Sequence, residues 1–323
     1  MRASGILLPV SSLPGKYGIG SFSEEAYKFV DFLKDSKQQY WQILPIGPTS
    51  YGDSPYQSFS TYAGNPYFIS LEELIEQGLL TEKECDKVDF GDKIDKVDYE
   101  KLYNGRFKLL KKAYKRSNIR EREEFKKFKD ENQYWLNDYA MFMAIKERFK
   151  GQSFDNWAED IKLRWGYSME YYQNELKEEI EFYEFVQYEF YRQWYKLKKY
   201  ANDNGVKIIG DIPIYVAYDS ADVWSHPELF QIDDKGKTIA VAGCPPDGFS
   251  ATGQLWGNPL YKWDYHKQTN YDWWIKRIER SVQLYDVVRI DHFRGFDEYY
   301  SIPARDEDAT NGHWEKGPGI DLF

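Results

Sequence analysis

Two carboxylates at the ends of apolar strands carry the most chemical information in this sequence. Asp211 lies in the apolar run 206–214, and Asp291 lies in the apolar run 286–292. Arg289 precedes Asp291 by two residues, so strand alternation places both side chains on one face. The guanidinium favours the ionised carboxylate, and a fixed carboxylate at a strand end can attack an electrophilic carbon. The alternative is a plain Arg–Asp ion pair that closes the strand end.

Glycosyl transfer with retention of configuration is a reaction class that needs such carboxylates. It uses two carboxyl groups about 5–5.5 Å apart, one attacking the anomeric carbon and one protonating the leaving oxygen. Asp291 fits the first role, and Asp211 is a candidate for the second that spacing alone does not decide. Other chemistries lack their motifs, since the sequence has no GxSxG elbow, no Walker loop and no GxGxxG after a strand.

The four histidines show no metal-ligand spacing, and we expect neither a metal nor a cofactor. His226 and His266 are interpreted as structural or surface residues. His292 directly follows the candidate nucleophile Asp291 and is the histidine of functional interest.

The elements that must position these groups fall into three zones. Residues 1–70 predict strands at 5–10 and 40–46 joined by a helix over 24–34, followed by a polar, aromatic loop at 47–57. Residues 71–204 predict a helical lobe inserted between two strands, with apolar side chains every four residues from Phe182 to Trp194 and a stop at Asn204–Gly205. Residues 205–323 return to strands and loops. We therefore predict an α/β fold with parallel strands, whose site lies at their carboxyl ends.

Composition narrows the class of protein further. The chain has 323 residues, 43 Lys and Arg against 53 Asp and Glu, and a net charge of −10, which argues against nucleic acid as the main partner. Cys85 and Cys244 exclude a disulfide framework, and no apolar stretch is long enough for a membrane span. We expect a cytoplasmic protein. Aromatic residues reach 18 %, which suits either a packed core or flat platforms in a cleft.

Several long motifs, in order along the chain, resemble the amylomaltases, the bacterial 4-α-glucanotransferases of glycoside hydrolase family 77. They are SGILLPVSSLPGKYGIG from Ser4, LPIGPTSYGDSPYQSFSTYAGNPY from Leu44, DIPIYVAYDSADVW from Asp211, PPDGFSATGQLWGNPLYKW from Pro245 and DVVRIDHFRGF from Asp286. The resemblance implies a (β/α)8 TIM-type barrel with helical insertions. It also implies disproportionation, in which α-1,4-glucan segments move between maltooligosaccharides by a retaining double displacement.

The resemblance also assigns site residues. Asp291 matches the nucleophile, and Tyr51 matches an aromatic of a second glucan-contact region. The segment 243–260 resembles a lid loop, which matters because transfer needs water to be kept from the intermediate. The positions that match substrate-binding residues are Ser54, Tyr56, Asp211, Gln254, Trp256, Asn258, Arg289 and His292.

The sequence departs from the family pattern mainly at its end. The general acid/base Glu of the family lies beyond the last matching motif, so we expect it to be absent from this chain. Only the first four of eight barrel strands find a match: the first two in 1–70, and the third and fourth in 205–323. The expectation is a C-terminally truncated amylomaltase. Gly248 stands where the family has a larger residue, which would loosen the lid and favour hydrolysis. A non-catalytic glucan-binding fragment and an α-glucan hydrolase are the alternatives.

Overall fold

Four parallel strands form the sheet that positions the predicted site. The computed structural model describes residues 2–50, 52–93 and 95–323. The sheet has the order β1 (Gly5–Leu7), β2 (Tyr40–Gln42), β3 (Lys207–Pro213) and β6 (Val287–Asp291). All three neighbouring pairs are parallel, so the carboxyl ends of the strands meet at one edge. Strand order follows chain order, as in successive units of a (β/α) barrel.

The first two strands are shorter than the apolar runs that predicted them. β1 ends at Leu7 before Pro9, and Val10 already begins a 3-10 helix. β2 ends at Gln42 before Pro45. Proline has no N–H to donate to a sheet, so each run stops pairing before its proline. The helix α1 (Glu24–Asp35) between them is confirmed and buries Ala26, Val30 and Leu33.

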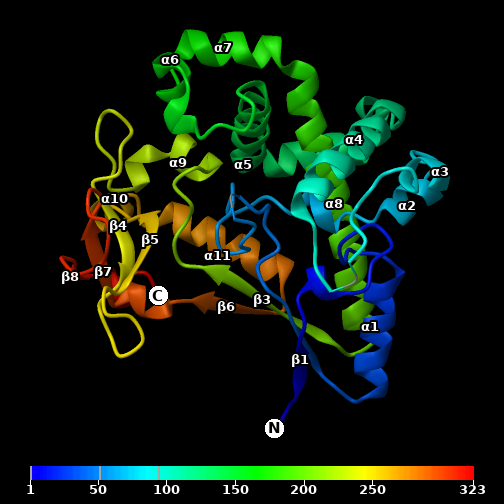
Figure 1. The fold of residues 1–323 in the computed structure, drawn as a ribbon, viewed down its shortest axis with the longest axis horizontal. Helices are drawn as coiled ribbons and strands as arrows, with labels where there is room; N and C mark the ends of the chain where they lie inside the picture. Colours follow the sequence, from blue (N-terminus) through cyan, green and yellow to red (C-terminus); the bar gives the residue numbers. More distant parts are fainter. Residues whose placement is uncertain (1, 51, 94) are drawn as a thin grey trace.

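Between β2 and β3 the chain is helical. The α-helices of this segment are α2 (Leu71–Glu76), α3 (Glu82–Cys85), α4 (Tyr99–Arg116), α5 (Glu123–Arg148), α6 (Glu159–Lys162), α7 (Gly166–Glu175) and α8 (Lys177–Asp203). The long helices α5 and α8 pack against each other, and α4 packs on α8 (Figure 1). The predicted apolar stripe of α8 is confirmed, because Phe182, Val186, Phe190 and Trp194 are all buried. The domain boundaries at 70 and 204 stay predictions.

Short 3-10 helices connect many of these elements. They are η1 (Val10–Ser12), η2 (Pro66–Phe68), η3 (Ile119–Glu121), η4 (Phe154–Asn156), η5 (Pro227–Leu229), η6 (Phe293–Phe296) and η7 (Gly319–Asp321). Across the described ranges, no helix combines the length and apolar character that crossing a bilayer requires.

Buried polar contacts fasten the helical segment to the loops above the sheet. Gln187 of α8 accepts from the Gly64 N–H at 2.7 Å and donates to the Gly64 carbonyl at 2.9 Å. A Cβ on Gly64 would stand 2.1 Å from the Phe190 ring, so the close approach requires glycine here. Lys146 of α5, 4 % exposed, pairs with Asp219 in the loop after β3. Asp219 also accepts from the Phe154 N–H.

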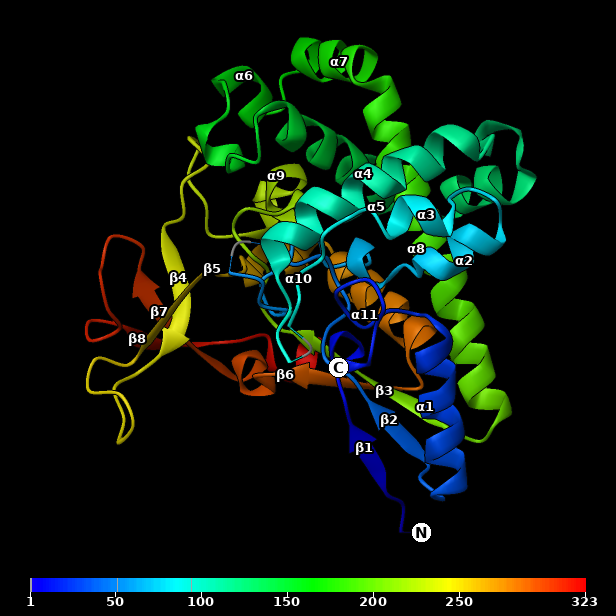
Figure 2. The same ribbon diagram turned by 45° about the vertical axis from the view of Figure 1, so that its right-hand side comes forward.

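A second, antiparallel sheet lies beside the parallel one and was not predicted. Its strands have the order β5 (Gln254–Pro259), β4 (Ala240–Cys244), β7 (Glu298–Pro303) and β8 (His313–Lys316). Figure 2 shows it standing to one side of β1, β2, β3 and β6. The expectation that 243–260 is a loop was wrong, because the segment lies largely within the β4–β5 hairpin, while its role as a lid stays a prediction. Its many Gly and Pro residues hid the strand pattern.

The remaining helices line the β3–β6 connection. They are α9 (Ala221–Ser225), α10 (Trp263–Gln268) and α11 (Asp272–Leu284), and α11 contacts both β3 and β6. Here His266 is fully buried among the rings of Tyr261, Trp263 and Trp273. Its Nε2 lies 3.2 Å from the Leu229 carbonyl. Burial lowers its pKa to about 4, so the neutral imidazole is part of the core.

Candidate active site

The register between β3 and β6 brings the predicted charged residues together. Asp211 lies opposite Arg289, and Pro213 lies opposite Asp291. Both strands end at this edge of the sheet, where an apolar run gives way to loops. The prediction that Arg289 and Asp291 share a face is confirmed by their contact, since Arg289 Nη2 donates to Asp291 Oδ1 at 2.6 Å.

Arg289 holds both carboxylates at once. Its Nη1 donates to the two oxygens of Asp211 at 2.7 and 2.8 Å, while Nη2 serves Asp291. The two carboxylates raise the pKa of Arg289 above its usual range. Asp211 is almost fully enclosed, with 2 % of its side chain exposed, whereas Asp291 exposes 40 %. Asp211 is therefore a buried counter-ion, and Asp291 is the carboxylate that an incoming molecule can reach.

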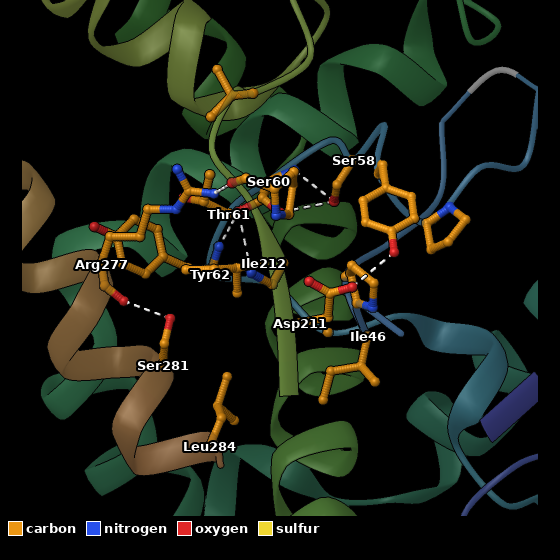
Figure 3. Close-up of a pocket in the computed structure, with 18 of the residues that line it drawn as sticks. Ile46, Ser58, Ser60, Thr61, Tyr62, Asp211, Ile212, Arg277, Ser281 and Leu284 are labelled. Atoms are coloured by element: carbon orange, nitrogen blue, oxygen red, sulfur yellow. Dashed lines mark hydrogen bonds between the residues drawn. The ribbon is translucent and has the colours of Figure 1, made fainter. Parts of the chain in front are cut away.

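The loop after β2 supplies a hydroxyl to the same cluster. The Tyr56 hydroxyl donates to Asp211 Oδ2 at 2.7 Å, and burial together with this contact raises the pKa of Tyr56 to about 12. Figure 3 shows Asp211 pointing from β3 toward this loop, beside a cavity of about 50 Å³ that Ile46, Thr61 and Arg277 help to line. Ser54 accepts from the Tyr56 N–H at 3.3 Å. Ser54 thus shapes the loop around Tyr56.

His292 leaves the strand in a left-handed backbone conformation, at φ 54°. This turn sends its ring toward Trp256, whose ring meets it edge-on at 4.9 Å, and toward Tyr215 at 6.2 Å. Burial lowers the pKa of His292. Its Nε2 is buried and has no hydrogen-bond partner among the described residues.

The hairpin residues predicted for the lid divide into two kinds. Trp256 is half-buried and donates from Nε1 to Gln254 Oε1 at 3.0 Å. Asn258 is only 5 % exposed, and its amide bonds to Gln57 and to the Val216 carbonyl. The structure thus brings Trp256 to the cluster but places Asn258 beneath the surface.

Several residues singled out in the sequence are not part of the described cluster around Arg289. Tyr51 lies outside the described residues. The interpretation of His226 and His266 as structural or surface residues is confirmed, because His226 pairs with Glu228 and His266 lies in the core. Gln57 and Tyr215 were not predicted as site residues, although both lie in motifs that resemble the family. No group of three metal-binding side chains occurs in the described part of the chain.

The arrangement offers an accessible carboxylate, an arginine that fixes it, and aromatic rings on two sides. These features suit binding of a polyhydroxylated ring and attack on its electrophilic carbon. Both oxygens of Asp211 are already engaged, because Arg289 donates to each of them and the Tyr56 hydroxyl donates to Oδ2.

Comparison with known proteins gives a consistent match. A family model described as 4-alpha-glucanotransferase matches residues 8–323. A 4-alpha-glucanotransferase of Clostridium butyricum is 52 % identical over 315 residues, which are 97 % of this chain and 65 % of the relative. One of Thermus thermophilus is 46 % identical over 326 residues, 100 % of this chain and 64 % of the relative. The chain thus spans slightly less than two thirds of the length of these relatives.

Solved structures agree. The amylomaltase from Streptococcus agalactiae in complex with acarbose is similar with a TM-score of 0.96 and 46 % identity, over 100 % of this chain and 66 % of that chain. The amylomaltase from Corynebacterium glutamicum, 20 % identical, shares the fold with a TM-score of 0.79, over 99 % of this chain and 45 % of that chain. The predicted α/β fold of this type is therefore confirmed.

Proposed function

The chain belongs to the 4-alpha-glucanotransferase family, and from that premise we propose that it acts in the transfer of α-1,4-glucan segments between maltooligosaccharides. One observation carries the proposal: Arg289 fixes Asp291 at the end of β6 while 40 % of the Asp291 side chain stays accessible. This is what a carboxylate nucleophile requires at a sugar subsite. The acarbose complex of the Streptococcus agalactiae amylomaltase supports an α-glucan ligand.

In the proposed reaction Asp291 attacks the anomeric carbon of the donor sugar. A bond forms between an Asp291 oxygen and this carbon, and the bond from the carbon to the 4-oxygen of the leaving glucan breaks. The leaving oxygen takes a proton from a general acid. In the second step the 4-hydroxyl of an acceptor sugar attacks the same carbon and gives its proton to the conjugate base of that acid, and the bond between the carbon and Asp291 breaks.

The neighbouring residues have distinct proposed roles. Arg289 holds Asp291 in place, Asp211 is the buried counter-ion that orients Arg289, and Tyr56 lines the donor subsite next to the reacting carbon. His292 and Trp256 contribute a wall of two rings that meet edge-on. Gln254 faces the acceptor side, and Ser54 shapes the loop that carries Tyr56. We assign no general acid among the described residues, because the second strand-end carboxylate is already occupied by Arg289 and Tyr56.

The test uses α-maltotriosyl fluoride as donor, because fluoride leaves without needing a proton from an acid. We expect fluoride release, and with added maltose we expect products longer than the donor. Asp291→Asn abolishes release, while Asp297→Asn, a nearby exposed carboxylate, does not. Release with only free maltotriose as product would indicate a hydrolase and overturn transfer. If α-maltotriosyl fluoride binds but no fluoride ion is released, the assignment of Asp291 as nucleophile is overturned. That result would favour a non-catalytic glucan-binding chain.

The proposal also names the partners of the protein. Maltooligosaccharides are the proposed partners, and the cytoplasmic location stays a prediction.

A further inference from the structure

Asn258 stands at the junction of three segments around the candidate active site. Its Nδ2 donates to the Val216 carbonyl at 2.7 Å and to Gln57 Oε1 at 3.4 Å, and its Oδ1 accepts from Gln57 Nε2 at 3.1 Å. These bonds join the β5 strand of the hairpin to the loop after β2 and to the loop after β3. With 5 % of the residue exposed, the amide is committed to these partners.

Each partner of Asn258 is next in sequence to a ring of the site. Gln57 follows Tyr56, whose hydroxyl donates to Asp211 at 2.7 Å. Val216 follows Tyr215, whose ring lies 6.2 Å from both Trp256 and His292. Through one amide, the structure fixes a ring on each side of the Arg289-linked carboxylates.

Two side-chain contacts tie the loop that carries Gln57 to other parts of the site, Tyr56 to Asp211 on β3 and Gln57 to Asn258 on β5. Within the loop, the Ser50 N–H donates to the Gln57 carbonyl and the Gln57 N–H donates to the Ser54 carbonyl. These bonds shape the turn around Tyr56 but do not attach it to the hairpin. The Gln57 side chain supplies that attachment, since its amide is bonded to Asn258 in both directions.

We propose that Asn258 and Gln57 form a latch that positions Tyr56 and the β4–β5 hairpin together, so that displacing either segment displaces the other. Asn258 is in this view a positioning residue and does not bind the sugar. The functional consequence rests on the proposed function. A latch of this kind holds the ring of Tyr56 and the ring of Trp256 in one arrangement around the donor sugar.

The first test is hydrogen exchange followed by mass spectrometry on the wild type, Asn258→Ala, Gln57→Ala and the double variant. We expect each single substitution to speed amide exchange about 10-fold in both the 52–58 loop and the 243–257 hairpin, and the double variant to add little. Asn174→Ala, an exposed amide on α7, is the matched control. Faster exchange confined to the substituted segment would overturn the latch. Gln57 is half-buried, so Gln57→Ala still decides the question if Asn258→Ala fails to fold.

The second test measures KM and kcat for fluoride release from α-maltotriosyl fluoride. The latch predicts KM about 10-fold higher in each single variant, no further rise in the double variant, and kcat within about 3-fold of the wild type. Additive effects of the two substitutions would overturn the coupling. If the wild type releases no fluoride, the proposed function fails, while the exchange experiment still decides whether the latch exists.

Discussion

The buried imidazole of His266 makes the stability of this protein depend on pH in a calculable way. Its pKa in the folded chain is about 4, against an ordinary value of 6.5, because burial disfavours the charged ring. The unfolded chain therefore binds this proton more readily, and stability is lost as pH falls below 6.5 toward 4. At pH 5 this histidine alone costs about 2 kcal/mol relative to pH 8, and the limit at still lower pH is about 3.4 kcal/mol.

The perturbation that isolates this effect is His266→Phe. Phenylalanine keeps a ring among Tyr261, Trp263 and Trp273 and removes both the titration and the contact with the Leu229 carbonyl. We expect the variant to be less stable than the wild type at pH 8 by about 1 kcal/mol, the worth of one hydrogen bond. At pH 5 we expect the variant to be the more stable of the two proteins. Only in the wild type must a histidine that is protonated in the unfolded chain lose its proton on folding.

The assay is urea unfolding followed by tryptophan fluorescence at pH 5, 6, 7 and 8. The difference in unfolding free energy between wild type and variant removes contributions from all other groups. His226→Gln is the control of opposite sign, since Glu228 raises the pKa of His226 and its protonated form stabilises the fold at low pH. The reasoning would be refuted if the difference in unfolding free energy between wild type and variant changed by less than about 0.5 kcal/mol from pH 8 to pH 5.

Three other substitutions test contacts described above. Lys146→Met leaves Asp219 without its buried cation, and urea unfolding should show a loss of about 3 kcal/mol; a loss below about 1 kcal/mol would mean that water replaces the ammonium. Gly64→Ala places a Cβ 2.1 Å from the Phe190 ring, and we expect a thermal-unfolding loss of about 1–3 kcal/mol that Phe190→Leu partly restores. Arg289→Met leaves the buried carboxylate of Asp211 with the Tyr56 hydroxyl alone, and urea unfolding should show a loss of about 3 kcal/mol; a loss below about 1 kcal/mol would mean that water replaces the guanidinium.

The parallel sheet and the charged cluster could be predicted because their causes are local. Apolar runs that end in a carboxylate indicate strands whose ends face a site, and two-residue spacing set Arg289 and Asp291 on one face. Helix periodicity likewise predicted α8 from its buried stripe. The family resemblance added Tyr56, which the structure then places on Asp211.

The second sheet and the latch could not be predicted, because their causes are tertiary. The strand β4 is built of Ala, Val, Gly and Cys, which show no alternation of apolar and polar residues. Asn258 looks like an exposed polar residue in a Gly- and Pro-rich stretch. Its burial depends on Gln57 and Val216, which only the folded chain brings near.

The helical segment between β2 and β3 also bears on how the chain folds. Trp41 pairs with Ile208, so this strand pair must close a loop that includes α2 to α8. Closing a flexible loop of that length costs about 4.5 kcal/mol of entropy before any sheet contact forms. The pairing of α5 with α8 is more local, and the bonds of Gln187 to Gly64 return the chain from α8 to a point near the end of β2. Once these helices have packed, the loop that the β2–β3 pair must close is shorter. The packed helical segment therefore lowers the entropic cost of forming the sheet that carries the carboxylates.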